Sequence, residues 1–486
     1  MSEMVEQSMM ERISTGIPGL DRVLQGGLPV GSVFIVQGSP GVGKTVMANQ
    51  ICFRHASGGG RSVYVTLLAE SHDRLLKHLS PMEFYQSEHV PSSIYYVSCF
   101  DKLMRDGLPG VLEFLVSEAK SRKASLLVLD GLFVLEETAR SACEFRKFIN
   151  DLAMLANLLG CTVLLLTNSA RQSSNPEYTM VDGWIELAAR CKDTRSYRTL
   201  TVHKVRGSDF IAGQHMFTIS KAGLTVLPRF ESVLAGTSWS DAGTGRLGTG
   251  VDDLDRMLDG GLPCGSATLM LGPTGIGKTT LGLHFISQCT PSEPGLIFGF
   301  YENAARLKRR AQNYGIDLDG LMASGAVEMI WRPPTENLLD QLGYELLDRV
   351  RQRKVARLFV DGVDAFAHSV IFQERLPSFL TALTGTLRDE GVTTVYSMEL
   401  PFLMGGEHHI SLGSISAVAE NIVLLRYVEQ QSQMRRTLTL VKVRESGFDR
   451  SIREYSITDR GIRMGGTISG AAPASAAIDT ASPNIL

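Results

Sequence analysis

The sequence has little net charge. Its 486 residues include 48 Lys and Arg and 51 Asp and Glu, so the formal net charge is −3 with histidine neutral. This balance excludes a protein that binds nucleic acid through a strongly basic overall surface, although a local basic patch would be compatible with it. Charged residues make up 20% of the chain and apolar residues 44%. That apolar content excludes a wholly disordered chain.

Cysteine patterns and long apolar runs are also lacking. The seven cysteines are scattered, with no Cys-x-x-Cys pair and no Cys/His spacing, which excludes a zinc ribbon or a redox motif. An odd number of cysteines without a framework fits reduced thiols in the cytoplasm. No apolar run approaches the ~18 residues of a membrane-spanning helix. The polar first residues predict no signal peptide. We therefore expect a cytoplasmic protein without membrane contact.

An internal repeat sets the domain organisation. Residues 13–45 and 247–279 share 17 identities in 33 ungapped positions, at a constant offset of 234. The shared residues include a Thr-Gly pair, a Leu-Asp-Arg triplet and a Gly-Gly-Leu-Pro turn, which precede a glycine-rich loop. A period this long indicates a tandem duplication of a whole domain, not a solenoid unit.

Composition divides the chain into five predicted segments. We expect a disordered N-terminus at 1–11, a first domain at 12–229, a linker at 230–245, a second domain at 246–463 and a disordered tail at 464–486. The linker is rich in Gly and Ser. The tail is rich in Gly, Ala, Ser and Pro and carries almost no charge, so it cannot form a core of its own.

The alternation of short apolar runs with helix-length segments predicts an α/β fold. In the first domain the expected strands are 33–37, 62–68, 94–97, 126–130 and 162–167, and a helix is expected at 144–159, before Gly160. Apolar strands that alternate with helices form a mostly parallel sheet covered on both faces. After residue 167 the pattern changes to strands with short turns, including 198–205 and 214–219, which predict an antiparallel extension of the sheet.

Two segments fit the phosphate-loop pattern Gly-x-x-x-x-Gly-Lys-Thr. Each follows an expected strand and opens an expected helix, which is the context the motif requires. Glycines let backbone N–H groups surround phosphate oxygens, and the helix N-terminus adds positive potential. We expect Lys44 and Lys278 to neutralise the phosphates of ATP. The expected nucleotide-binding residues are Gly38, Ser39, Pro40, Gly41, Val42, Gly43, Lys44, Thr45, Gly272, Pro273, Thr274, Gly275, Ile276, Gly277, Lys278, Thr279 and Thr280.

Hydroxyl and carboxylate groups are predicted to hold Mg²⁺ in each domain. A threonine that follows the lysine of the loop places its hydroxyl on the metal. An acid at the end of a buried strand is the other protein side chain expected beside the metal. Thr45 and Asp130 have these positions in the first domain, and Thr279 and Asp361 have them in the second. The predicted cofactors are therefore ATP and Mg²⁺.

A water-activating base is expected after the second strand of each domain. Glu70 and Glu302 occupy this region, at the edge of the sheet where the phosphates would lie. After the fifth strand, Thr167 and Asn168 form a polar pair that could contact the γ-phosphate. The corresponding stretch of the second domain, 397–399, is interpreted as less polar in the relevant place.

Paired cations recur late in each domain. Lys204 and Arg206, and Lys442 and Arg444, are each separated by one residue, so strand alternation would place both cations on one face. Because the sequence shows no evident local acidic partner for these cations, we expect them to reach the nucleotide of a neighbouring copy of the chain.

These residues together resemble the KaiC family, circadian-clock ATPases of the RecA-like superfamily. The duplicated core, the two loops, the Lys-x-Arg segments and the stretches 422–429 and 451–459 carry the resemblance, which covers residues 12–463. It implies two tandem RecA-like P-loop domains in a double-ring homohexamer with ATP between protomers. The four cations of the Lys-x-Arg segments match the family's interface residues.

The resemblance also implies different roles for the two domains. The first is expected to hydrolyse ATP, and the second to autophosphorylate a pair of neighbouring Ser and Thr residues across the interface between protomers. Counting back from Leu424, the serine corresponds to Ser416, whereas Ala417 occupies the threonine position. The family has a Glu-Glu pair after the second strand, but this chain has one acid in each domain, Glu70 before Ser71 and Glu302 before Asn303. The sequence leaves open which position of the pair each acid occupies.

Two other functions stay open. One is a RecA-like nucleic-acid motor or recombinase, and the other is a nucleotide-gated scaffold without kinase activity. A motor requires a basic channel loop, but residues 169–176 contain one cation and residues 404–409 contain none. Nucleic acid is therefore not expected as a partner. Other copies of the chain, and regulatory proteins of a Kai-like or signalling system, are the partners that the resemblance implies.

Overall fold

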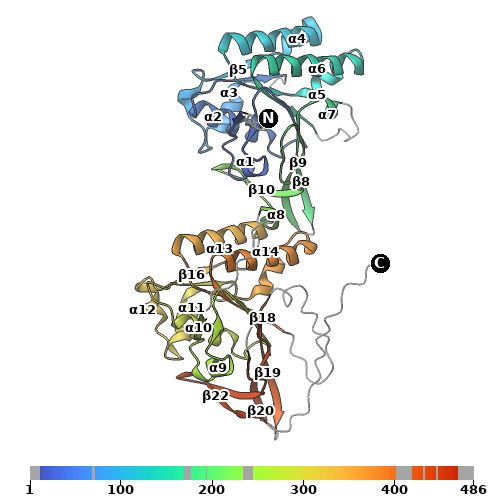
Figure 1. Cartoon of the computed structure of the whole chain (residues 1–486). Coiled ribbons are helices and arrows are strands. Elements are labelled where there is room, and N and C mark those ends of the chain that lie inside the picture. The colour runs from blue at the N-terminus through green and yellow to red at the C-terminus, as the bar shows by residue number, and fades with distance from the viewer. Residues whose placement is uncertain are drawn as a thin grey trace, which may run out of the picture. The chain divides into compact units, whose positions relative to one another are not determined.

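The computed structural model describes two compact units, one up to Val233 and one after it, each considered by itself (Figure 1). Its description covers residues 11–67, 72–168, 177–192, 194–233, 245–335, 337–400, 419–430, 433–444 and 447–468. Within these residues, each unit contains a nine-stranded sheet and a separate two-stranded one. Of the described helices, none is long and apolar enough to cross a lipid bilayer.

The large sheet of the first unit joins a parallel part to an antiparallel part, as the change of pattern after residue 167 predicts. The parallel strands run from β8 to β5, and β9, β10 and β11 extend the sheet in antiparallel fashion. The order across the sheet is β11 (Gly223–Leu227), β10 (Gln214–Ser220), β9 (Arg195–Val205), β8 (Gly183–Lys192), β3 (Val33–Gly38), β7 (Thr162–Thr167), β6 (Leu126–Asp130), β4 (Ser62–Thr66) and β5 (Ile94–Ser98).

The large sheet of the second unit has the same arrangement, and its strands are given below starting from the parallel edge. Its antiparallel extension consists of β20, β21 and β22. The order is β16 (Val327–Trp331), β15 (Gly295–Gly299), β17 (Arg357–Asp361), β18 (Thr393–Glu399), β14 (Ala267–Gly272), β19 (Asn421–Gln430), β20 (Gln433–Lys442), β21 (Arg453–Thr458) and β22 (Gly461–Thr467).

Helices cover both faces of each parallel part. In the first unit the main helices are α2 (Lys44–Ser57), α3 (His72–Leu79), α4 (Phe100–Arg122), α5 (Leu132–Thr138) and α6 (Ala142–Leu159). In the second they are α10 (Lys278–Ser287), α11 (Ala304–Gln312), α12 (Leu318–Ala323), α13 (Leu339–Arg353) and α14 (Leu376–Asp389). The short helices are α1 (Leu20–Val23), α7 (Glu177–Met180), α8 (Phe230–Val233) and α9 (Asp252–Met257).

Strand alternation gives the first unit two cores. Phe34 and Val36 of β3 belong to a buried cluster with α2 and α3, whereas Val33 and Ile35 belong to another cluster with α4, α5 and α6. Every residue of β3 is buried, which explains why this strand is a continuous apolar run instead of an alternating one. The carboxyl end of this central strand is thereby held between two packed layers.

The repeated segment before each loop forms the same hydrogen-bonded clasp twice. The backbone N–H and the hydroxyl of Thr15 both donate to Asp21, and those of Thr249 both donate to Asp255. The two-stranded sheets, β1 (Arg12–Ile13) with β2 (Leu28–Pro29) and β12 (Arg246–Leu247) with β13 (Leu262–Pro263), close these segments. The identities outside the loops therefore have a structural explanation.

The helix after each loop packs on its sheet differently in the two units. A Cβ added to Gly282 of α10 would lie 2.2 Å from the ring of Phe359 in β17, so only glycine fits there without a shift. The first unit has Ala48 and Val128 at the corresponding positions of α2 and β6, by the 234-residue offset and by the alignment of Asp130 with Asp361. A small helix residue thus faces a large strand residue in one unit, and the volume is shared more evenly in the other.

Two expected boundaries differ from the secondary structure. Strand β22 continues to Thr467, four residues beyond the expected end of the second domain at 463, because it pairs with β21 along its length. Helix α8 occupies 230–233, the start of the expected linker, and Phe230 is fully buried. The expected disordered segments 1–11 and 464–486 and the rest of the linker lie largely outside the described residues.

Candidate active site

Both phosphate loops lie between a strand and a helix. The first connects β3 to α2, and the second connects β14 to α10. Gly43 and Gly277, which immediately precede the helices, both have φ of 118°, a backbone conformation that favours glycine. A Cβ would also lie 2.5 Å from Ile219 at the first position and 2.7 Å from Ile457 at the second. The glycines of the motif are therefore required by the turn itself.

The loop lysines are held above the loops by backbone carbonyl groups. Lys44 Nζ donates to the carbonyl oxygens of Gly38 at 2.6 Å and Ser39 at 3.1 Å. Lys278 Nζ donates in the same way to Gly272 at 2.7 Å and Pro273 at 2.9 Å. Partial burial lowers the pKa of both lysines, and nearby carboxylates oppose this effect.

The expected metal residues come together in both units. Thr45 Oγ1 donates to Asp130 Oδ2 at 3.3 Å, and Thr279 Oγ1 donates to Asp361 Oδ2 at 3.1 Å. In the described part of the chain, no group of three or more His, Cys, Asp or Glu residues could hold a metal alone. One hydroxyl and one carboxylate suit Mg²⁺, which usually keeps several waters and takes its other ligands from substrate phosphates.

A second hydroxyl orients each of these aspartates, and it comes from a different strand in each unit. Tyr64 of β4 donates to Asp130 Oδ2 at 2.8 Å, whereas Ser397 of β18 donates to Asp361 Oδ1 at 2.7 Å. Ser397 Oγ in turn accepts the N–H of Gly362 at 2.8 Å. Burial raises the pKa of Asp361, and its hydrogen bonds with Ser397 and Thr279 oppose the rise. Sequence reasoning did not identify these hydroxyls as partners of the aspartates.

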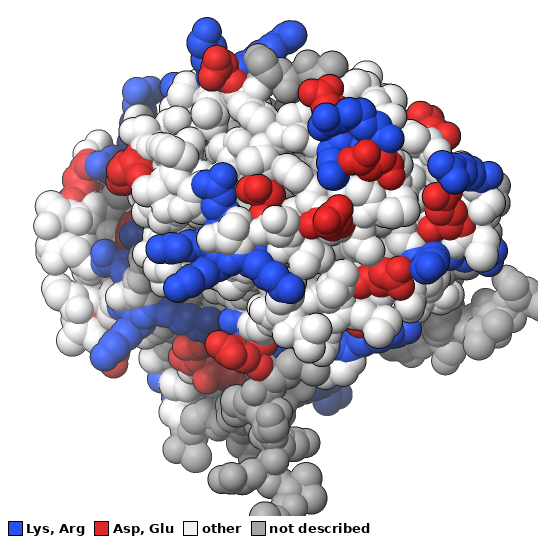
Figure 2. Space-filling view, turned by 90° about the horizontal axis from the view of Figure 1, so that it is seen from above, with Lys and Arg blue, Asp and Glu red and all other residues white. Residues whose placement is uncertain are grey.

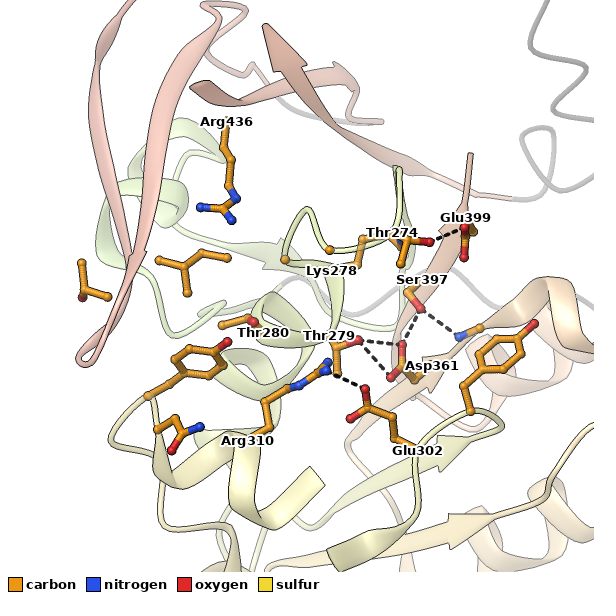
Figure 3. A pocket seen from close by; sticks show the side chains of 18 of the residues that line it. Thr274, Lys278, Thr279, Thr280, Glu302, Arg310, Asp361, Ser397, Glu399 and Arg436 are labelled. Atoms are coloured by element: carbon orange, nitrogen blue, oxygen red, sulfur yellow. Dashed lines mark hydrogen bonds and ion pairs between the residues drawn. The ribbon is translucent and has the colours of Figure 1, made fainter. Parts of the chain in front are cut away.

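The second unit has a cavity of about 930 Å³ beside its loop (Figure 3). The loop, the ends of the parallel strands and the antiparallel extension all contribute to its walls. Acidic residues outnumber basic ones in the lining, where Glu302, Asp361, Asp364, Glu399 and Asp459 accompany Lys278, Arg310 and Arg436. Residues 397–399 are less polar at one position, where Met398 corresponds to Thr167, but Ser397 and Glu399 on either side both line this cavity.

Glu302 lies in the cavity and is paired with a cation. Its Oε1 is 2.7 Å from Nη2 of Arg310, a residue of α11 (Figure 3). The next residue, Asn303, is the N-cap of α11, because its side chain accepts the N–H of Arg306 at 3.0 Å. An amide at that position therefore has a structural function, while Glu302 is left facing the cavity.

Strand register aligns the acids of the two units. Thr66 pairs with Asp130 and Gly299 pairs with Asp361, so these positions correspond. Glu302 follows Gly299 by three residues, whereas Glu70 follows Thr66 by four. Counted along the sequence from these strand ends, the two glutamates fall at adjacent, different positions of the family's Glu-Glu pair. Glu70 itself, like the phosphosite candidate Ser416, lies outside the described residues.

The expected interface cations are held by carbonyl groups of their own unit. Lys204 Nζ donates to the carbonyl oxygens of Tyr178, Thr179 and Val181, at 3.1, 2.9 and 2.6 Å. Lys442 Nζ donates to the carbonyl of Ala419 at 2.7 Å. Burial lowers the pKa of both lysines.

The arginines of these pairs differ from the expectation. Strand β9 ends at Val205 and β20 at Lys442, so Arg206 and Arg444 lie beyond the strands and alternation does not place them. Arg206 has an acidic neighbour that the sequence did not indicate, since its Nη1 lies 3.8 Å from Asp182. Both arginines are exposed, and neither Lys442 nor Arg444, both described, lines the cavity of its own unit.

Removing the hydroxyl of Tyr64 or of Ser397 should weaken nucleotide binding only in the unit that contains it. We expect Ser397→Ala to weaken Mg²⁺-dependent nucleotide binding about tenfold or more in the second unit, because a hydrogen bond to a charged group contributes roughly 1.5–3 kcal/mol. Tyr64→Phe should act only on the first unit, where Leu166 occupies the position equivalent to Ser397. Titration of nucleotide at several Mg²⁺ concentrations, in Lys44→Ala and Lys278→Ala backgrounds, separates the two sites.

The control for these substitutions is Tyr396→Phe, which removes a buried hydroxyl that contacts Thr384 instead of an aspartate. An unchanged Mg²⁺ dependence in Ser397→Ala would show that this hydroxyl does not orient Asp361.

Comparisons with known proteins agree with the duplicated organisation of the chain. The family model "ATPase: KaiC" matches twice, over residues 13–231 and 247–467. The chain is 28% identical to the circadian clock protein KaiC3 of Synechocystis sp. (strain PCC 6803), over 95% of this chain and 93% of that protein. It is 27% identical to the circadian clock oscillator protein KaiC of Rippkaea orientalis, over 93% of this chain and 88% of that protein.

The resemblance noted from the sequence is thus confirmed, and so are the two tandem α/β domains. Each match spans a complete loop, the aspartate that ends β6 or β17 and the antiparallel extension. The chain belongs to the KaiC family of ATPases.

Proposed function

We propose that both domains bind Mg²⁺-ATP, that they hydrolyse it at sites completed by a neighbouring copy of the chain, and that the second domain also phosphorylates the chain. The observation that carries this proposal is the twice-built arrangement of loop lysine, threonine hydroxyl and buried aspartate. When bound, Mg²⁺ would supply positive charge beside the phosphates. Thr45 and Asp130 would hold it in one domain, and Thr279 and Asp361 in the other.

Positioning and electrostatics do most of the work in such a site. The lysines would exchange their carbonyl partners for the β- and γ-phosphates, which offer a stronger charge-assisted hydrogen bond. Glu302 would accept the proton of the attacking group once Arg310 releases it or turns toward the phosphate. Glu70 corresponds in sequence to Asn303, the residue after Glu302. The proposed bases of the two domains would therefore be contributed by different positions of the corresponding segments.

The rate of phosphate release tests this proposal. We expect the double variant Lys44→Ala/Lys278→Ala to lose turnover, and each single variant to retain only the other domain's share, because each loses a contact that contributes roughly tenfold to hundredfold in affinity. Glu70→Gln and Glu302→Gln should keep nucleotide binding and slow hydrolysis by ~10²-fold or more in their own domain. Lys147→Ala, at an exposed position of α6, is the control. A double variant with undiminished turnover would remove both loops from the mechanism.

Assembly is the second part of the proposal. Lys204, Arg206, Lys442 and Arg444 would complete the nucleotide site of the adjacent protomer in a homohexamer. Exposure of the two arginines supports this role, because an exposed cation is accessible to a phosphate, although Arg206 would first have to leave Asp182 and the carbonyl of Thr179. On the face drawn in Figure 2, basic side chains lie in small groups with acidic ones close by, which favours a protein partner over a nucleic acid. The names of the relatives support regulatory proteins of a Kai-like or signalling system as further partners.

Native mass spectrometry tests the assembly. We expect Mg²⁺-ATP to shift chains of 53.0 kDa into a hexamer, since a ligand bound between protomers stabilises their association by mass action. Arg206→Ala and Arg444→Ala should raise the nucleotide concentration needed for the ring. Only monomer at micromolar protein and saturating nucleotide would contradict the proposal.

Phosphorylation of Ser416 is the third part. A hydroxyl near the γ-phosphate of a neighbour can replace water as the nucleophile when a base and a cation align it. The serine would lose its proton to Glu302, its oxygen would bond to the γ-phosphorus, and ADP would leave. Ala417 restricts this chemistry to one residue where the family pattern has two.

Phosphopeptide mapping after incubation with Mg²⁺-ATP tests the kinase activity. We expect phosphate chiefly at Ser416, and its loss in Lys278→Ala and Glu302→Gln but not in Lys44→Ala. Ser416→Ala should abolish the signal while leaving hydrolysis in the first domain intact. If residues 405–430 carry no phosphate in hexamer with verified nucleotide occupancy, the second domain is an ATPase or a scaffold and not a kinase.

A further inference from the structure

A carboxylate contacts the phosphate loop of the second domain. Glu399 is the last residue of β18 and pairs in register with Gly272, the first residue of the loop. The hydroxyl of Thr274, the third residue of the loop, donates to the carboxylate of Glu399 (Figure 3). The acid is therefore fixed against the loop that would hold the phosphates.

The place of β18 in the sheet indicates which phosphate Glu399 would meet. This strand lies between β14, which leads into the loop, and β17, which ends at Asp361. Its carboxyl end is thus between the loop and the Mg²⁺-side aspartate, where the terminal phosphate of ATP has to lie. ADP would leave this space to solvent.

The charges around the two loop lysines differ accordingly. Burial lowers the pKa of Lys278, and the carboxylates of Glu399, Asp361 and Asp364 oppose the shift, Glu399 most strongly. Burial also lowers the pKa of Lys44, but Asp130 is the carboxylate that opposes it there. In the second domain, nearby carboxylates therefore balance more of the positive charge of the loop lysine than in the first domain.

The first domain lacks both members of the Thr274–Glu399 pair. Pro40 occupies the loop position of Thr274 and has no hydroxyl to donate. Thr167 pairs with Gln37, which places the neutral Asn168 where the second domain has Glu399. At this place the second domain therefore has a carboxylate and a threonine hydroxyl that donates to it, whereas the first domain has neither group.

We propose that Glu399 is a specificity-determining residue that disfavours the γ-phosphate, so that the second domain favours ADP over ATP more than the first domain does. This inference depends on the proposed nucleotide binding at both loops. Glu399 is exposed, so water screens its charge, but like charges held close together still repel each other, whereas an amide in the same place does not repel a phosphate. Glu399 would then slow the exchange of product for fresh ATP in the domain proposed to phosphorylate the chain.

Isothermal titration of the full-length protein tests the proposal. Mg²⁺-ADP and Mg²⁺-ATPγS are titrated into a Lys44→Ala background, in which the second loop is the one left to bind nucleotide, with and without Glu399→Gln. We expect Glu399→Gln to shift the affinity ratio toward ATPγS by about tenfold or more, which corresponds to 1.4 kcal/mol. Glu374→Gln, which removes an exposed acid outside the cavity lining, is the control and should leave the ratio unchanged.

The reciprocal substitution keeps the test decisive even if Glu399→Gln does not fold. Asn168→Glu in a Lys278→Ala background should shift the first loop toward ADP. An unchanged ratio in Glu399→Gln, or in Asn168→Glu where the former cannot be purified, overturns the inference. Loss of hydrolysis in Glu399→Gln at an unchanged ratio would likewise overturn it and make Glu399 a base. If Lys44→Ala and Lys44→Ala/Lys278→Ala bind both nucleotides equally, the proposed function fails instead, and this inference with it.

Discussion

Both sites depend on the turn that leads from each central strand into the following helix. Gly43 and Gly277, with φ of 118°, set the direction of that helix, and with it the positions of the next lysine and threonine. A helix that starts here points its free N–H groups at the loop, where they favour an anion. A side chain at either glycine would strain this backbone conformation and crowd Ile219 or Ile457.

The antiparallel extension is part of the same constraint. Ile219 and Ile457 pack against the two glycines, and in the second domain Tyr455 donates to the carbonyl of Ile276 at 2.6 Å. Tyr427 donates to the neighbouring carbonyl of Gly275 at 3.1 Å. These contacts come from β10, β19 and β21, which pair with the strands β9 and β20 that carry Lys204 and Lys442. A contact of Lys204 or Lys442 with a neighbouring protomer, as proposed above, would therefore act on strands adjacent to the ones that contact the loop.

Much of this arrangement could be predicted from the sequence, because the motifs are local. The loop lysines, their threonines and the strand-terminal aspartates follow from short patterns, and the parallel strands follow from apolar runs. The orienting hydroxyls could not be predicted, since Tyr64 and Ser397 reach their aspartates from strands far away in the sequence. Neither could the carbonyl groups that hold Lys204, nor Asp182 beside Arg206, because such contacts depend on the path of the chain after the strand. Register between strands, which single-sequence patterns do not supply, was needed to align Glu70 with Asn303.

The unequal packing of the loop helices has a consequence for how the chain reaches its native state. Tandem domains of similar sequence are prone to misassembly, in which an element of one domain docks on the sheet of the other. A helix with Ala48 placed on the strand with Phe359 would clash with the ring, while a helix with Gly282 placed on the strand with Val128 would leave a void. Either error is destabilised relative to the native pairing. The complementary volumes therefore help each half of the newly made protein to select its own helix.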